Sequence, residues 1–169
     1  MFGDQIPDAA AAAETVEAVG RAIAQLCAYA AGKGVDVLLE IHGDFNTVEA
    51  VSGVIRICGQ YSSFGILWDV EHSDRAYGDG WRAFYDVIRP YVRHTHFKDH
   101  IRNADGTFTL CLPGEGDIPL LEIAAALRKD GYSGYYSLEW EKKWHPELPE
   151  PEEALAAYRV LMDRAEQAL

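Results

Sequence analysis

The chain has few cysteines, no long apolar run and no excess of basic residues. Its three cysteines are scattered and lack the spacing of metal ligands, so we expect reduced thiols and a cytoplasmic protein. Its apolar runs last only a few residues, which predicts no membrane-spanning segment. Acidic residues and a proline interrupt any apolar stretch at the start of the sequence, so we also expect no signal peptide.

The charge balance is strongly acidic, with a formal net charge of −12. Affinity for nucleic acids and anionic membranes comes largely from Lys and Arg, so the sequence predicts neither as a partner. A small sugar or a divalent cation is compatible with this charge. At 169 residues, with 49% hydrophobic and 25% charged residues, the sequence predicts a single globular domain over residues 1–169.

Helical and strand patterns alternate along the whole chain. Asp8 is the expected N-cap of a helix that runs to Ala31, with a buried stripe at five positions, Val16, Val19, Ile23, Leu26 and Ala30. Four short apolar segments predict strands at residues 35–42, 64–70, 91–99 and 134–141, and each is followed by a helical stripe. Crossover helices between strands indicate a parallel sheet and the α/β class.

Two loops have their own patterns. Residues 72–80 are rich in turn formers and predict a loop before the third helix of the chain. The stretch after residue 98 contains the turn signal Ala104-Asp-Gly-Thr107 and an extended-type segment at residues 108–112, which together predict a small hairpin.

Every predicted strand ends in a residue that can bind a metal ion. Glu40, Asp69, His96 and Glu139 occupy these ends. Because side chains alternate along a strand, His94 and His96 share one face, which is an unusual choice for a purely apolar core. Parallel α/β proteins place their sites at the carboxyl ends of their strands. The four residues therefore predict one metal site assembled from four strands.

On these residues the chain resembles the xylose isomerase-like TIM-barrel superfamily of sugar and sugar-phosphate isomerases and epimerases. The resemblance lies in an ordered set of motifs: Glu40, Asp69 with His72, the run His94-Thr-His-Phe-Lys-Asp99, and Glu139. The turn Pro113-Gly-Glu-Gly-Asp117 and the segment Gly131-Tyr-Ser-Gly134 are similar to the family as well.

The resemblance covers only the second half of an eight-unit barrel. It implies a parallel (βα) half-barrel that corresponds to strands 5–8, with all four metal ligands in the half that is present. The residues that the first half of a full barrel adds to the sugar pocket have no counterpart in this sequence.

The resemblance also implies the chemistry of the site. Glu40, Asp69, His96 and Glu139 would hold one divalent ion, and three carboxylates with one imidazole favour Mn²⁺, Mg²⁺ or Co²⁺, with Zn²⁺ as the alternative. Glu40 and Glu139 would transfer a proton to and from the carbon next to the carbonyl of a sugar, through an enediolate.

Substrate contacts are implied for three further residues. His72, Lys98 and Arg102 would hold substrate oxygens or a phosphate.

Structural readings compete with the functional ones at several positions. A single carboxylate at a strand end is commonly a solvated loop residue. We interpret His94 as a hydrogen-bonded core histidine. For His42, the sequence does not separate a structural role from a functional one. We interpret Glu115 as an acidic loop residue and Glu141 as a residue that lines the rim of the site. We expect the last two histidines, His100 and His145, to be surface residues.

Two other functions stay open at this point. One is an apurinic endonuclease, which shares the scaffold but uses extra histidine ligands; the acidic charge and the missing ligands disfavour it. The other is a catalytically inactive or split half-barrel that needs another chain. Because four strands would leave open edges and an uncovered apolar face, we also expect a homo-oligomer, most simply a dimer through the strand layer.

Overall fold

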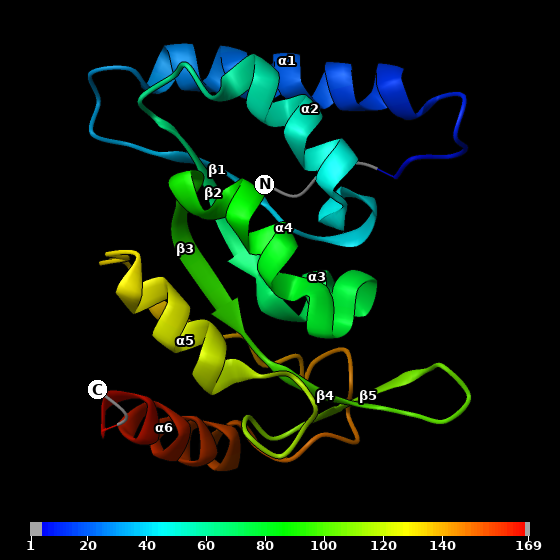
Figure 1. Ribbon diagram of the computed structural model, residues 1–169, viewed down its shortest axis with the longest axis vertical. Helices are drawn as coiled ribbons and strands as arrows, with labels where there is room; N and C mark the ends of the chain where they lie inside the picture. The colour runs from blue at the N-terminus through cyan, green and yellow to red at the C-terminus, as the bar shows by residue number, and fades with distance from the viewer. Residues whose placement is uncertain (1–4, 168–169) are drawn as a thin grey trace. The chain divides into compact units, whose positions relative to one another are not determined.

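The computed structural model describes residues 5–167, which form two compact units. The boundary falls after Thr95, inside strand β3 (Val92–Phe97). Figure 1 shows the chain with its helices and strands labelled. Each unit contains its own helices and its own part of the strand layer, so the two are described in turn.

The first unit alternates helices with parallel strands. Its elements are α1 (Ala12–Ala30), β1 (Val37–Glu40), the 3₁₀ turn η1 (Gly43–Asn46), α2 (Val48–Cys58), β2 (Phe64–Asp69), α3 (Val70–Tyr77), η2 (Gly78–Gly80), α4 (Trp81–Ile88), η3 (Arg89–Tyr91) and the start of β3. Strands β1 and β2 pair in parallel, with Glu40 opposite Leu67, and β3 follows β2 in the sheet. The carboxyl ends of β1 and β2 therefore lie at the same edge.

The core of the first unit forms where β2 meets the helices. Phe64, Ile66 and Trp68 alternate along the strand and are almost fully buried. The Trp68 ring stacks on Tyr85 of α4 at a centroid distance of 4.9 Å. Burying side chains of this size removes a large apolar area from water, and this fixes the strand against the helices.

Helices α1 and α2 lie side by side in Figure 1, and small residues allow their close approach. A Cβ atom added to Gly53 would lie 2.4 Å from a methyl carbon of Val16, and one added to Gly20 would lie 2.6 Å from the Cδ1 of Ile57. The N-cap of α1 is Ala11, three residues after the predicted N-cap Asp8. Asp8 instead accepts the N–H of Ala11 in the turn before the helix, at 2.8 Å.

The buried stripe of α1 differs from the prediction at Leu26, which is 45% exposed. Cys27 is fully buried in its place, and the buried set is Gly20, Ile23, Cys27 and Ala30. Both stripes have helical spacing, and leucine is the larger side chain. The packing of α1 against α2 at Gly20 selects the stripe that contains this glycine.

The predicted loop at residues 72–80 is wrong, because α3 begins at Val70 directly after β2. Asp69 acts as the N-cap of α3: its Oδ1 accepts the N–H groups of Glu71 and His72 at 3.0 and 3.4 Å. An aspartate followed by a glutamate two residues later is a helix-start signal that the turn-rich composition obscured.

The second unit begins at the end of β3. It contains the hairpin of β4 (Asp99–Arg102) and β5 (Phe108–Cys111), the helix α5 (Leu120–Lys129), the strand β6 (Tyr136–Leu138) and the helix α6 (Pro151–Gln167). The hairpin is antiparallel, as predicted. The end of β3 lies beside β6, where the N–H of Glu139 donates to the carbonyl of Phe97 at 3.0 Å. Phe97 packs on the rings of Tyr136 and Tyr158.

These observations confirm the α/β class and its parallel strands. The prediction of one domain over the whole chain is not tested by this division and stays a prediction. Among the described residues, no helix combines the length and the apolar character that crossing a membrane requires.

Candidate metal centre

In the first unit, Glu40 and Asp69 are the last residues of two paired parallel strands. Asp69 is fully buried and Glu40 is partly buried. The Oδ1 of Asp69 is engaged as the cap of α3, whereas its Oδ2 faces the Nε2 of His72 at 3.8 Å. The capping bonds hold the carboxylate in one orientation, so its second oxygen is presented in a defined direction.

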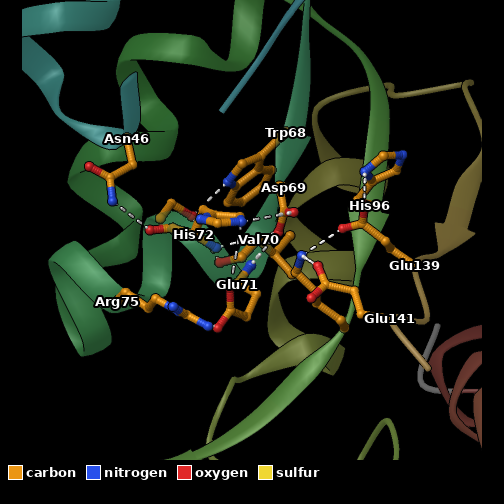
Figure 2. Close-up of polar contacts among 12 residues, drawn as sticks. Asn46, Trp68, Asp69, Val70, Glu71, His72, Arg75, His96, Glu139 and Glu141 are labelled. Atoms are coloured by element: carbon orange, nitrogen blue, oxygen red, sulfur yellow. Dashed lines mark hydrogen bonds and ion pairs between the residues drawn. The ribbon is translucent and has the colours of Figure 1, made fainter. Parts of the chain in front are cut away.

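His72 lies on the first turn of α3, and its side chain is 13% exposed (Figure 2). Its ring lies close to that of His42, with centroids 3.9 Å apart. Its carbonyl accepts a hydrogen bond from the side-chain amide of Asn46, at 3.0 Å. Asn46 belongs to η1, so the loop after β1 and the helix after β2 hold each other in place around two imidazoles.

An ion pair whose glutamate is fully buried stabilises this helix. Glu71 is fully buried and pairs with Arg75 one turn later, and its Oε2 lies 4.0 Å from the Nε2 of His72. Glu71 is not among the site residues predicted from the sequence. A glutamate in the first turn with an arginine four residues later is the signal that was available.

In the second unit, His96 and Glu139 come from neighbouring strands. The Nδ1 of His96 lies 3.5 Å from the Oε1 of Glu139, and both side chains are partly exposed (Figure 2). Two ligand atoms that each lie about 2.1 Å from one ion are separated by roughly 3 to 3.5 Å. The spacing of this pair is therefore suited to a shared metal ion.

Lys98 lies next to this pair and is only 3% exposed. Its ammonium donates to the Oε2 of Glu139 at 2.6 Å and to the Oε1 of Glu141 at 2.8 Å. The predicted contact of Lys98 with a substrate stays a prediction. In the structure, the ammonium of Lys98 binds the carboxylates of Glu139 and Glu141.

Arg102 lies at the far end of β4, opposite Phe108 in the hairpin. Its backbone N–H donates to the Oδ2 of Asp117 at 2.7 Å. This contact ties the hairpin to the turn at residues 113–117. The role of the Arg102 side chain in substrate binding stays a prediction.

Asp99 binds the backbone of the glycine-rich turn at residues 113–117. Its fully buried carboxylate accepts four backbone N–H groups, those of His100, Gly114, Gly116 and Ile118, at 2.8 to 3.3 Å. Burial nevertheless raises the pKa of the Asp99 carboxyl, and the four N–H donors offset this shift only in part. The carboxylate therefore anchors the glycine-rich turn to the start of β4.

Two histidines of the second unit behave differently from each other. His100 is fully buried, so its prediction as a surface residue is wrong. Its ring packs against Phe108 across the hairpin, with centroids 4.5 Å apart. His145 is 43% exposed at its side chain and lies near Glu141 and Glu147, on the accessible side of the second unit.

The first unit also contains a cavity of about 560 Å³ between α1 and α2, away from the strand ends. Its walls are mainly apolar, and its charged residues are Glu17, Glu49 and Arg56. Glu17 is paired with Arg21 along the same helix face. The cavity shares no residue with the candidate metal ligands.

Comparison with known proteins assigns the chain to a family. The model of the xylose isomerase-like TIM barrel matches residues 3–164, which is nearly the whole sequence. The chain belongs to this family. Fructoselysine 3-epimerase of Shigella flexneri is 26% identical over 152 residues, which cover 86% of the chain and 53% of the epimerase. The chain thus spans about half the length of the curated relatives it matches.

Solved structures share the fold. A D-tagatose 3-epimerase-like protein superposes with a TM-score of 0.78 at 20% identity, over 98% of this chain and 61% of that protein. The IOLI protein, whose crystal structure contains a zinc atom, superposes with a TM-score of 0.74 at 19% identity, over 98% of this chain and 60% of that protein. At this identity the likeness establishes the fold.

Proposed function

We propose that this xylose isomerase-like chain is the metal-binding part of a sugar or sugar-phosphate isomerase or epimerase. It would correspond to strands 5–8 of the barrel. The relatives named above include a fructoselysine 3-epimerase, and the chain covers 53% of its length. The observation that carries the proposal is the His96–Glu139 pair, an imidazole and a carboxylate 3.5 Å apart at the ends of neighbouring strands.

The proposed ligands of one divalent ion are Glu40, Asp69, His96 and Glu139. Each of them offers one atom of a type that binds divalent metals, and Asp69 is the buried member of the set. Three carboxylates with one imidazole suit Mn²⁺, Mg²⁺ or Co²⁺, and Zn²⁺ is compatible as well. The zinc atom in the IOLI structure is consistent with a divalent ion in this fold.

A bound ion would polarise the carbonyl and the neighbouring hydroxyl of a sugar, acting as a Lewis acid. The residues of the chain would then move the proton. Glu40 or Glu139 removes the proton from the carbon next to the carbonyl, and the other glutamate returns a proton to complete the isomerisation or epimerisation. His72 and Arg102 would hold sugar oxygens, and Lys98 would add positive charge near the developing negative charge.

A second candidate is a half-barrel that turns over substrate only together with another polypeptide. The observation that favours it is the coverage of 53% of the curated epimerase. In this case the chain would bind metal, and the sugar pocket would be completed by residues from elsewhere.

Metal titration followed by an activity panel tests both candidates. We expect calorimetry to show Mn²⁺ binding, and we expect Glu139→Gln to weaken it about tenfold or more, because a ligand is lost. A matched control is Glu152→Gln, which removes a carboxylate from the exposed first turn of α6. Equal Mn²⁺ affinity in the wild type and in Glu139→Gln would contradict the metal site. Isomerisation of a ketose panel by the chain alone would favour the first candidate over the second.

A further inference from the structure

The ammonium of Lys98 lies between two carboxylates of the second unit, those of Glu139 and Glu141. Figure 2 labels these two glutamates. Lys98 is 3% exposed, so it has almost no access to water. A buried ammonium is stable only when charged or hydrogen-bonding partners replace its water. Glu139 and Glu141 supply these partners, at 2.6 and 2.8 Å.

This arrangement separates the two oxygens of Glu139. The Oε2 accepts from Lys98 at 2.6 Å, whereas the Oε1 faces His96 at 3.5 Å. A carboxylate with a short, charge-assisted bond to one oxygen has little freedom to rotate. The Oε1 of Glu139 is therefore turned toward the imidazole of His96, which is also a proposed ligand.

Glu141 is itself held by its surroundings. Its second oxygen lies 3.6 Å from the Nε2 of His145. Hydrogen bonds hold the segment after β6 in one conformation. The indole N–H of Trp140 donates to the carbonyl of Pro149 at 3.1 Å, and the ammonium of Lys142 donates to two backbone carbonyls. Glu141 therefore has a defined position from which it can hold Lys98.

We propose that Glu141 is a positioning residue that acts on Glu139 through Lys98, and this inference rests on the proposed function. Without Glu141, the buried ammonium loses one of the two carboxylates that accept its hydrogen bonds in this contact, and Glu139 remains. The ammonium then binds the proposed metal ligand more strongly and competes with the ion for it. Residues that orient metal ligands in this way influence metal affinity without touching the ion.

The test is Mn²⁺ calorimetry on Glu141→Gln at 0.5 M salt, where interactions between distant charges are strongly screened. We expect the dissociation constant to rise about tenfold, which is typical for the loss of a residue that orients a metal ligand. The matched control is Glu147→Gln, because Glu147 lies on the same segment, is 70% exposed at its side chain and contacts His145. For this control we expect a change of less than about twofold.

A purely structural role for Glu141 would lower the melting temperature of the metal-free protein and leave the Mn²⁺ affinity of the folded protein unchanged, and that result would overturn the proposal. Glu141→Asp keeps the charge but withdraws the carboxylate from Lys98, so it should weaken Mn²⁺ binding in the same direction even if Glu141→Gln does not fold. If the wild type binds Mn²⁺ and only Glu139→Gln weakens it, the proposed function stands and this inference fails. If the wild type binds no Mn²⁺, both fail.

Discussion

The carboxylate of Asp99 accepts the backbone N–H of Gly116 at 3.1 Å, and the two residues are so close that no larger side chain fits at position 116. A Cβ atom there would lie 2.2 Å from the Oδ1 of Asp99 and 2.4 Å from the carbonyl oxygen of His100. The glycine thus allows the backbone to approach a buried charge. This contact fixes the turn that holds the β4–β5 hairpin.

Gly116→Ala should therefore be strongly destabilising. The added methyl group must displace either the Asp99 carboxylate or the backbone, and overpacking of this kind costs about 2 to 3 kcal/mol in the free energy of unfolding. Urea denaturation measures the change. Gly80→Ala is the control, because the nearest atom to a Cβ there is 4.0 Å away and the φ angle of −81° suits alanine. Similar losses in the two variants would contradict the importance of this contact.

The three thiols should react slowly in the folded protein. Burial raises the pKa of Cys27, that of Cys58 to about 11 and, together with neighbouring carboxylates, that of Cys111 to about 12. A raised pKa keeps the thiol protonated, so at pH 8 only about one Cys58 in 1,000 and one Cys111 in 10,000 is a thiolate. We expect reaction with a disulfide reagent to accelerate about tenfold per pH unit between pH 8 and 10.

Unfolding in denaturant provides the control for the thiols, since all three should then react at the rate of free cysteine. Mass spectrometry of the modified peptides identifies each site. Labelling of Cys111 within minutes at pH 8 in the native protein would show that its surroundings do not suppress the thiolate.

The proposed two-glutamate mechanism predicts exchange of a carbon-bound proton. If the chain, alone or with a complementing half, turns over a ketose, a deuterium on the carbon next to the carbonyl should be lost to solvent during the reaction, because a glutamate that carries it exchanges with water. Mass spectrometry of the product follows the label. Full retention at that carbon would indicate direct hydride transfer and exclude a proton relay through Glu40 and Glu139.

The strand layer predicts self-association. Leu38, Leu67 and Val92 are partly exposed, Tyr135 is 79% exposed, and β1 lies at the edge of the sheet. Free strand edges and apolar faces favour pairing with another chain. We expect a homo-oligomer, most simply a dimer of twice the monomer mass of 18.8 kDa, in light scattering at micromolar concentration. Leu67→Glu should shift it toward the monomer.

Metal should influence this assembly if the strand layers face each other. Two copies that pair through β1 and β2 would bring two sets of Glu40 and Asp69 close together, and like charges at short range repel. Added Mn²⁺ should then increase the dimer fraction. A stable monomer that binds no apolar dye would show that the strand layer is not an interface.

Several features of this protein could be predicted from its sequence because they depend on local patterns. Strand alternation and the following helical stripes determine the α/β class. The candidate ligands Glu40, Asp69, His96 and Glu139 could be selected because each ends a short apolar run, and sites of parallel α/β proteins lie at strand ends. Their role as metal ligands stays a prediction. The hairpin at β4 and β5 followed from its turn signal in the same way.

The tertiary structure decided the features that depend on contacts between distant residues. Leu26 and Cys27 both fit a helical stripe. Only the close approach of α2 at Gly20 selected the stripe that contains Cys27. The ring of the buried His100 packs against Phe108 of the facing strand, a contact that exists only once the hairpin has formed. Lys98 meets Glu139 and Glu141 although 41 and 43 residues separate them along the chain. A polar residue shows its type in the sequence, but its partner depends on which segments the fold brings within hydrogen-bond distance.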